Sequence, residues 1–174
     1  MNKKKLIKDI IKNYSTIKEI ESINFVGSFV KNKNYNDIDI VIIVNYLDKD
    51  IFNQCNNVIK KIDLKKHKIK KKIYINNTFG PLKFNNDKYL VFHLMIYTIG
   101  MHLKHVIESP FTCYDWERNT SDYGSNLKDI YSVGKLSLTD FKDRYRGISH
   151  YKKNIISGTI DYKKFSFHKK KFIL

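Results

Sequence analysis

Proline, glycine and cysteine are all scarce in this chain. Its 174 residues include two prolines and seven glycines, so no Pro- or Gly-rich linker divides it. The length suits one domain with a substantial core. The two cysteines, Cys55 and Cys113, lie far apart and outside any metal-binding spacing. A disulfide framework is therefore not expected.

Long hydrophobic runs are also missing. No stretch approaches the roughly 18 apolar residues that a membrane-spanning helix requires. The start, MNKKKLIKDIIKNY, is basic, but its apolar residues recur at helical spacing and Asp9 interrupts them, which is not typical of a signal peptide. We therefore expect a soluble, cytoplasmic protein with no membrane partner.

Basic residues, by contrast, are in large excess. Lysine and arginine number 33 against 17 aspartates and glutamates, a formal net charge of +16. Such a protein attracts polyanions, including nucleotides and nucleic acid. A general bias of composition explains the charge equally well, because Lys, Asn and Ile are abundant throughout. Arginine is the exception, since it occurs only at Arg118, Arg144 and Arg146.

Hydrophobic periodicity predicts an alternation of helices and strands in the first hundred residues. A helical period covers 3–14, with a continuation to about residue 20 left open, and recurs over 48–61. Apolar or alternating runs predict strands near 23–26, 38–44, 68–76 and 89–98. The run over 38–44 is β-branched throughout, which is typical of a central strand buried on both faces.

The second half of the chain favours helices. We expect one over 101–108, a proline-started segment after Ser109, and a longer helix from Ser137, where Ser-Leu-Thr-Asp resembles a capping box, to Gly158. The predicted fold is therefore α+β. A mixed β-sheet flanked by helices occupies residues 1–100, and a mostly helical C-terminal extension, 101–174, packs on it.

The stretch GSFVKNKNYNDIDIVIIV, residues 27–44, contains the most informative pattern. Asp37 and Asp39 point to the same side of a strand and meet at its beginning. Two buried carboxylates repel each other, so a cation is expected between them, and Mg²⁺ or Mn²⁺ suits carboxylate and phosphate oxygens. Asp-x-Asp alone is more often a solvated strand end. Here Gly27 and Ser28, at the end of the preceding strand, add a backbone and a hydroxyl suited to phosphate.

With these residues, NFVGSFVKNKNYNDIDIVIIV resembles the signature of the nucleotidyltransferase superfamily related to DNA polymerase β. That signature reads apolar-Gly-[Gly/Ser], a link of about nine to thirteen residues, then Asp-apolar-[Asp/Glu]-apolar; the link here has eight residues. The resemblance implies that Gly27 and Ser28 bind a nucleoside triphosphate and that Asp37 and Asp39 hold the metal ions. It also makes Lys31, within the link, a candidate nucleotide-binding residue.

The family commonly has a third carboxylate on a later strand, which is missing from YLVFHLMIYT, residues 89–98. His93 is the polar residue in the middle of that run. As a neutral imidazole it is a candidate catalytic base or metal ligand. A core histidine bonded to backbone is an equally good interpretation.

The later segment SPFTCYDWERNTSDYG resembles the Ser/Ala-Pro-Phe…Trp pattern of several small nucleotidyltransferases. The resemblance implies that Trp116 stacks on a base and that Arg118 meets a phosphate. Simple packing of a C-terminal helix explains the same residues and is favoured. Arg144 and Arg146 form a further candidate phosphate clamp.

The leading hypothesis is a metal-dependent enzyme that moves a nucleoside monophosphate from a nucleoside triphosphate to an acceptor and releases pyrophosphate. A small-molecule or protein acceptor is preferred, because the chain has no room for a separate RNA-binding domain. Two alternatives remain open. One is an enzyme that modifies tRNA or another nucleic-acid end. The other is a degenerate relative that binds a nucleotide or a partner without turnover.

Overall fold

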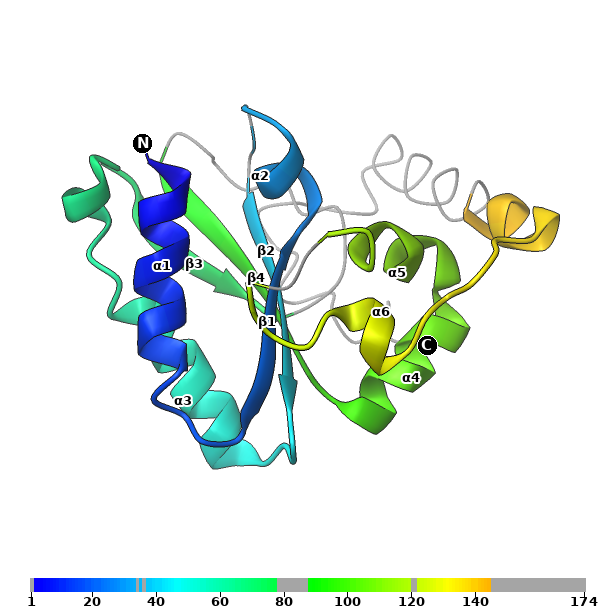
Figure 1. Ribbon diagram of the computed structural model, residues 1–174. Helices are drawn as coiled ribbons and strands as arrows, with labels where there is room; N and C mark the ends of the chain where they lie inside the picture. Colours follow the sequence, from blue (N-terminus) through cyan, green and yellow to red (C-terminus); the bar gives the residue numbers. More distant parts are fainter. Residues whose placement is uncertain (1, 34, 36, 78–87, 120–121, 145–174) are drawn as a thin grey trace, which may run out of the picture.

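A five-stranded mixed β-sheet forms the centre of the molecule (Figure 1). The computed structural model describes residues 2–33, 35, 37–77, 88–119 and 122–144. The strands lie in the order β3-β4-β2-β1-β5, and they are β1 (Ile20–Val26), β2 (Asp37–Val44), β3 (Lys72–Asn76), β4 (Tyr89–Thr98) and β5 (Tyr123–Gly124). The predicted α+β class is confirmed, and β2 is the central strand, as its β-branched run indicates.

The strands β2, β3 and β4 are mutually parallel, whereas β1 is antiparallel to both β2 and β5. The first residues of β2, β3 and β4 therefore lie at one end of the sheet. The strand β5 comes from the second half of the chain, so both halves contribute to a single sheet.

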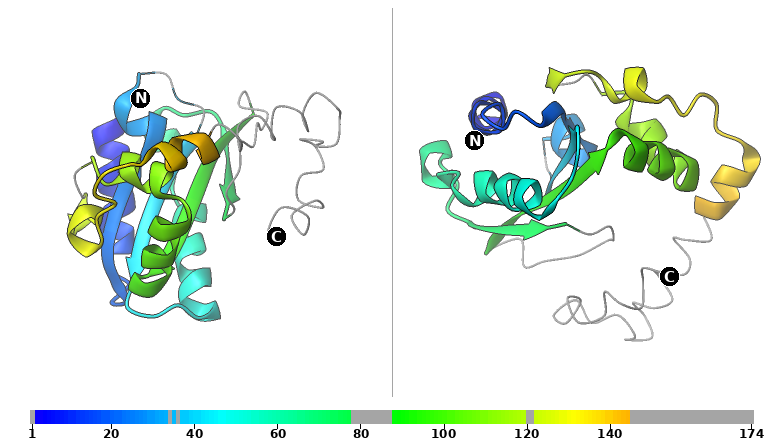
Figure 2. Two further views of the ribbon diagram at one scale, coloured as in Figure 1. Left: turned by 90° about the vertical axis from the view of Figure 1, so that its right-hand side faces the viewer. Right: turned by 90° about the horizontal axis from the view of Figure 1, so that it is seen from below.

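Helices cover both faces of the sheet (Figures 1 and 2). The first face is covered by α1 (Lys3–Tyr14) and α3 (Lys49–Lys60), and the second by α4 (Ile99–Glu108), α5 (Pro110–Trp116) and α6 (Leu127–Ile130). A five-residue helix, α2 (Gly27–Lys31), connects β1 to the link before β2, and a 3₁₀ helix, η1 (Leu64–His67), precedes β3.

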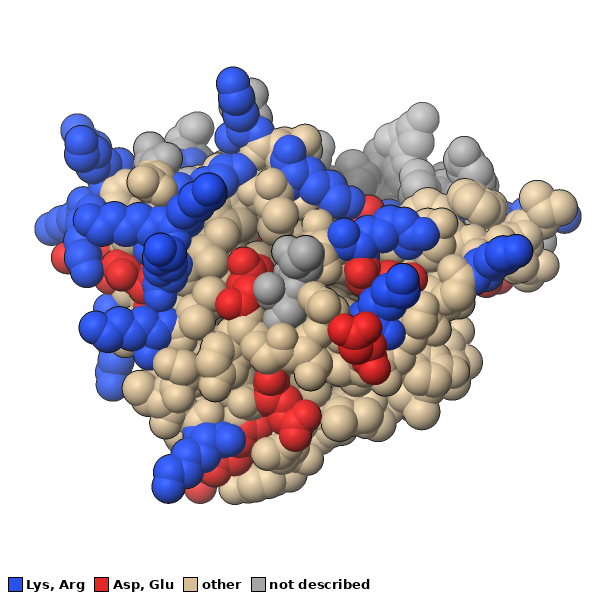
Figure 3. Space-filling model, viewed as in Figure 1, with Lys and Arg blue, Asp and Glu red and all other residues tan. Residues whose placement is uncertain are grey.

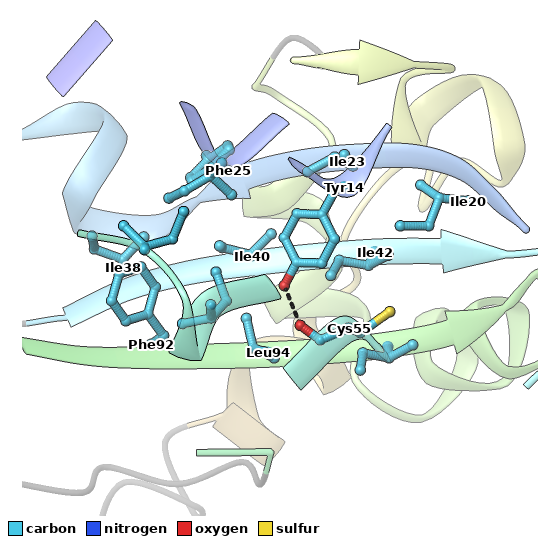
Figure 4. Packing of buried hydrophobic residues seen from close by; sticks show 14 of the residues in the cluster. Tyr14, Ile20, Ile23, Phe25, Ile38, Ile40, Ile42, Cys55, Phe92 and Leu94 are labelled. Carbon is cyan, nitrogen blue, oxygen red and sulfur yellow. Dashed lines mark hydrogen bonds between the residues drawn. The ribbon is translucent and has the colours of Figure 1, made fainter. Parts of the chain in front are cut away.

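The larger hydrophobic core lies on the first face (Figure 4). Even-numbered residues of β2, such as Ile38 and Ile40, point into it together with Leu6 and Ile10 of α1. The Tyr14 hydroxyl donates a hydrogen bond of 3.0 Å to the Cys55 carbonyl, which joins α1 to α3 inside this core. That bond satisfies a buried polar group, since an unpaired hydroxyl there would be costly.

A second core fills the opposite face. Odd-numbered Val41 and Ile43 of β2 and Met95 of β4 contact Val106 and Trp116 from the C-terminal helices. Strand alternation explains why one β-branched run serves both cores. No helix in the described ranges is long and apolar enough to cross a bilayer.

Most predicted elements occur where the pattern places them. The helix over 3–14 and the strand over 89–98 have the predicted bounds. The first helix ends at Tyr14 and does not continue to residue 20, where β1 begins. The strand expected over 68–76 starts only at Lys72, because Lys68 takes a left-handed backbone conformation (φ 59°) after η1.

In the second half, the sequence pattern does not predict β5 or α6. A helix begins at residue 138 as expected. Its capping box is formed, with the Ser137 amide donating to Asp140 Oδ2 at 2.7 Å and the Asp140 amide donating to Ser137 Oγ at 3.2 Å. Its expected end at Gly158 lies outside the described residues, and so does Arg146 of the candidate phosphate clamp.

Candidate metal site

Sheet register brings Asp37, Asp39 and His93 together. Asp39 of β2 is the direct partner of His93 of β4, and Asp37 is the partner of Val91. Paired residues of neighbouring strands share a face, and residues two apart on one strand do so as well. All three side chains therefore lie on the second face of the sheet. Within the described part of the chain they are the one group of three His, Cys, Asp or Glu residues with metal-binding geometry.

The imidazole of His93 lies between the two carboxylates. Its Nε2 is 3.6 Å from Asp37 Oδ2, and its Nδ1 is 3.7 Å from Asp39 Oδ1. Both separations are too long for a hydrogen bond. One ligand atom from each residue lies within 4.8 Å of the others. Ligands of one octahedral Mg²⁺ stand roughly 3 Å apart when adjacent and about 4.2 Å when opposite, so little movement is needed to bind an ion.

The electrostatics of the group favour a cation. Burial, and then the negative charge of Asp37, raise the pKa of Asp39 to about 7. Burial lowers the pKa of His93, with Asp37 partly opposing that effect, so the imidazole is neutral at pH 7. A neutral ring does not compensate the two acids. A divalent ion would supply the missing positive charge and hold both carboxylates ionised.

Gly27 is packed directly against this group. Its φ of +71° favours glycine, and a Cβ placed on it would lie 2.3 Å from Asp39 Oδ2. The neighbouring Val26 is the sheet partner of Asp39, which explains the close approach. The glycine at the end of β1 therefore makes room for the Asp39 carboxylate, a role that the sequence pattern does not predict.

The other two predicted residues of α2 differ in their surroundings. Ser28 is half-buried next to Gly27, and its carbonyl accepts a hydrogen bond of 2.9 Å from the Asn32 amide. Lys31 is exposed, and its ammonium group forms an ion pair with Asp115 of α5. The pair links the β1–β2 connection to the C-terminal helices.

The remaining two predicted nucleotide-binding residues make contacts within the C-terminal half. The Trp116 side chain belongs to the second core and is 7% exposed. Its ring stacks on His105, with centroids 5.3 Å apart and an interplanar angle of 4°. Arg118 lies over the Tyr114 ring and donates to the Tyr114 carbonyl at 2.5 Å. These contacts agree with the packing interpretation that the sequence favours.

Asn76 is a polar neighbour of the site that the sequence reasoning missed. It is the sheet partner of His93, and it is buried, with 3% of its surface exposed. Its amide therefore shares the face of Asp39 and His93. The only signal in the sequence is a polar residue at the end of an alternating strand, which equally marks the end of any strand.

The group of Asp37, Asp39 and His93 thus forms a site that can hold a metal ion, on an α+β fold. No protein-family model matches this chain, and no curated protein sequence matches it either.

Proposed function

We propose that this protein is a metal-dependent nucleotidyltransferase. It moves a nucleoside monophosphate from a nucleoside triphosphate to a small-molecule or protein acceptor and releases pyrophosphate. The observation that carries the proposal is the group of two acids and a neutral histidine, with Gly27 against Asp39. Gly27 and Asp39, one residue from each part of the sequence pattern, meet there.

In this proposal each residue has a stated role. Asp37 and Asp39 bind Mg²⁺ or Mn²⁺, which when bound supplies positive charge to the triphosphate and to the departing pyrophosphate. The acceptor oxygen attacks the α-phosphorus, the bond to the bridging oxygen breaks, and the acceptor gives up its proton. His93 is either the third ligand or the base that takes this proton, because its ring is neutral at pH 7.

The histidine also bears on the choice of metal. Imidazole suits transition metals better than it suits Mg²⁺, which prefers oxygen ligands. Two carboxylates with one imidazole should therefore bind Mn²⁺ more tightly than Mg²⁺. Replacing His93 with Asp, which restores the third carboxylate common in the family, should shift the preference back toward Mg²⁺.

The test combines binding with turnover. Thermal unfolding of the full chain is measured with Mg²⁺ or Mn²⁺ and each of the four nucleoside triphosphates, and pyrophosphate release is measured in parallel. A ligand at 100 times its dissociation constant stabilises the folded state by about 2.7 kcal/mol. We expect a metal-dependent rise in melting temperature with at least one triphosphate, and pyrophosphate release once an acceptor is supplied.

Asp37→Asn and Asp39→Asn are the matched variants, because they keep the shape and remove the charge. Both should abolish the metal-dependent rise and the release of pyrophosphate. Asp39→Asn should also raise the melting temperature without metal at pH 8, since it removes a buried charge. Near-normal turnover in either variant contradicts the metal assignment. Binding without any pyrophosphate release identifies the degenerate, non-catalytic alternative.

A further inference from the structure

A dense cluster of lysines lies on a part of the molecule that the proposed chemistry does not use. Residues 3–12 contain five lysines and one acid, and residues 60–72 contain eight lysines and one acid. Figure 3 shows basic side chains gathered over α1 and η1. We define the α1–η1 lysine patch as six exposed residues: Lys5, Lys8, Lys12, Lys65, Lys66 and Lys68.

Two contacts join the segments of the patch into one surface. Asp9 Oδ2 of α1 lies 2.9 Å from Nε2 of the buried His67 and 3.2 Å from the Lys66 ammonium. Lys5 and Lys12 flank Asp9 on the same side of the helix, because residues three and four apart are neighbours. Lysines from sequence positions some 60 residues apart therefore lie side by side.

The acids within these segments do not neutralise the patch. Asp9 is engaged by His67 and Lys66, and Asp63 accepts a hydrogen bond of 2.9 Å from the Lys65 amide as the cap of η1. Among the described residues, Lys66 is the one member of the patch with an ion pair. The other five lysines are exposed and have no ion-pair partner within the described part of the chain, which creates a strong local positive potential.

We infer that the α1–η1 lysine patch binds the phosphate backbone of double-stranded nucleic acid without regard to sequence. Lys5 and Lys12 are about 10 Å apart along the helix axis, a length over which a duplex carries about six phosphates. This binding needs neither metal nor triphosphate, so it goes beyond the proposed function and stands apart from it.

The absence of apolar side chains from the patch decides between partners. In the described part of the chain, large exposed hydrophobic residues occur elsewhere, such as Ile107 and Leu138, and none lies within α1 or η1. Single-strand binders use aromatic platforms for base stacking, and membrane-surface helices insert apolar side chains. A lysine-only surface instead suits the dense charge of a duplex.

The position of the patch relates it to the candidate metal site. The helix η1 leads into β3, whose first residues lie at the same end of the sheet as Asp37 of β2. In addition, the Lys3 ammonium donates to the Phe29 carbonyl at 2.5 Å, so the start of α1 contacts α2. Both segments of the patch are therefore joined to elements, β3 and α2, that lie next to β4 and β2 in the chain or in the sheet.

The test measures binding of a fluorescein-labelled 20-base-pair DNA duplex of mixed sequence, and of its single strand, to the full chain. It is done in EDTA, without nucleotide, from 50 to 300 mM salt. We expect the duplex to bind more tightly than the single strand and its affinity to fall steeply with salt. Replacing all six lysines of the patch with Gln should weaken binding at least tenfold at 100 mM salt. It should also reduce the log–log salt slope by up to about five.

The matched control removes the same charge from other elements. It replaces six exposed lysines with Gln: Lys18, Lys49, Lys104, Lys128, Lys135 and Lys142. This control should bind within about threefold of the unmodified chain. The measurement is made in EDTA and without nucleotide, so a failure of the metal proposal leaves this result unaffected.

Three outcomes overturn the inference. Equal losses of duplex affinity in the two six-lysine variants would mean that binding depends on the net charge of the protein and not on the patch. Binding to vesicles containing 30% phosphatidylserine but not to the duplex would assign the patch to a membrane surface. Normal duplex binding by the patch variant would place the interaction elsewhere. Circular dichroism checks that each variant is folded. If the six-lysine Gln variant is unfolded, duplex binding is measured instead with only Lys5, Lys8 and Lys12 replaced by Gln. Replacing the same three lysines with Arg should retain binding.

Discussion

At the scale of single residues, the close contact between Gly27 and Asp39 governs the site. The glycine has a φ of +71°, and the space beside its Cα is filled by the Asp39 carboxylate. A side chain at position 27 therefore has two separate consequences. It strains the backbone, and it displaces a candidate metal ligand.

Gly27→Ala should lower stability and impair metal binding together. The left-handed backbone conformation costs about 1–2 kcal/mol for a residue with a Cβ. The new methyl group must also push Asp39 Oδ2 from a contact of 2.3 Å. We expect a lower melting temperature and loss of the Mn²⁺-dependent stabilisation, both measured by thermal unfolding with and without the ion.

Gly134→Ala is the matched control. Gly134 also has a φ of +71°, but among the described residues, its two chain neighbours aside, no heavy atom lies within 4 Å of a Cβ built there. It should show the backbone cost alone and keep the full response to Mn²⁺. If Mn²⁺ stabilises both variants equally, Gly27 is not needed for metal binding.

At the scale of elements, an ion pair connects α2 to α5. Lys31 pairs with Asp115, and both side chains are close to half exposed, at 42% and 49%. Exposed pairs contribute at most about 1 kcal/mol to stability. The pair therefore does little for the fold, but it holds the one predicted nucleotide-binding lysine away from other anions.

Asp115→Asn should free Lys31 for a triphosphate. If Lys31 contacts phosphate, we expect this variant to bind nucleoside triphosphate about two- to fivefold more tightly and Lys31→Met to bind it more weakly, as measured by calorimetry with Mn²⁺. Glu108→Gln, which removes the distant surface pair with Lys104, serves as the control. Unchanged affinity in both Lys31→Met and Asp115→Asn would rule out a nucleotide-binding role for Lys31.

A second element-scale prediction concerns the histidines of α4. Burial, with the nearby His102, lowers the pKa of His105 to about 4. The unfolded chain, with a histidine pKa near 6.5, takes up the proton first, so this group favours unfolding progressively as the pH falls from about 6.5 to about 4. The loss is at most about 1.4 kcal/mol per pH unit.

Comparison with His105→Phe isolates this effect, because the substitution keeps an aromatic ring against Trp116. Titration of Asp39 is common to both proteins and cancels in the difference. We expect the free energy of unfolding, from urea denaturation at pH 4.5 to 7.5, to fall less steeply with acid in the variant. Parallel pH profiles would show that His105 titrates normally in the folded protein.

At the scale of the whole molecule, one sheet is shared by both halves of the chain. Residues 1–100 supply Val26, Val41, Ile43, Met95 and Tyr97 to the second core, where Trp116 and Leu127 from the C-terminal half cover them. The β5 strand pairs with β1, and Asp122 Oδ2 accepts from the Phe25 amide at 3.1 Å. The predicted boundary at residue 100 therefore divides segments that share a core.

A fragment of residues 1–100 should fail to fold cooperatively. Exposing five core side chains removes on the order of 10 kcal/mol of burial, which is comparable to the whole stability of a typical domain. We expect broad, non-cooperative urea denaturation and strong binding of a hydrophobic dye, whereas the full chain unfolds in one transition. A sharp transition in the fragment would instead define residues 1–100 as an independent domain.

Much of the fold and the centre of the site could be predicted from local pattern. Asp37 and Asp39 were identified from their spacing, because strand alternation places residues i and i+2 on one side whatever the remaining fold. The surroundings of Lys31 and Trp116 could not be predicted in this way. Asp115 lies 84 positions from Lys31, and no local signal indicates that pairing.

The sequence by itself determined α1, α3 and the four strands β1 to β4 of the first hundred residues, though not α2 or η1. It also determined the two acids at the start of β2 and the excess of lysine. These features depend on side-chain periodicity and composition, which act over a few residues. The tertiary structure alone decided that His93 lies between the acids, that Gly27 makes room for Asp39, and that α1 and η1 form one lysine surface. Such contacts depend on strand order and register, which hydrophobic burial fixes only when distant segments pack together.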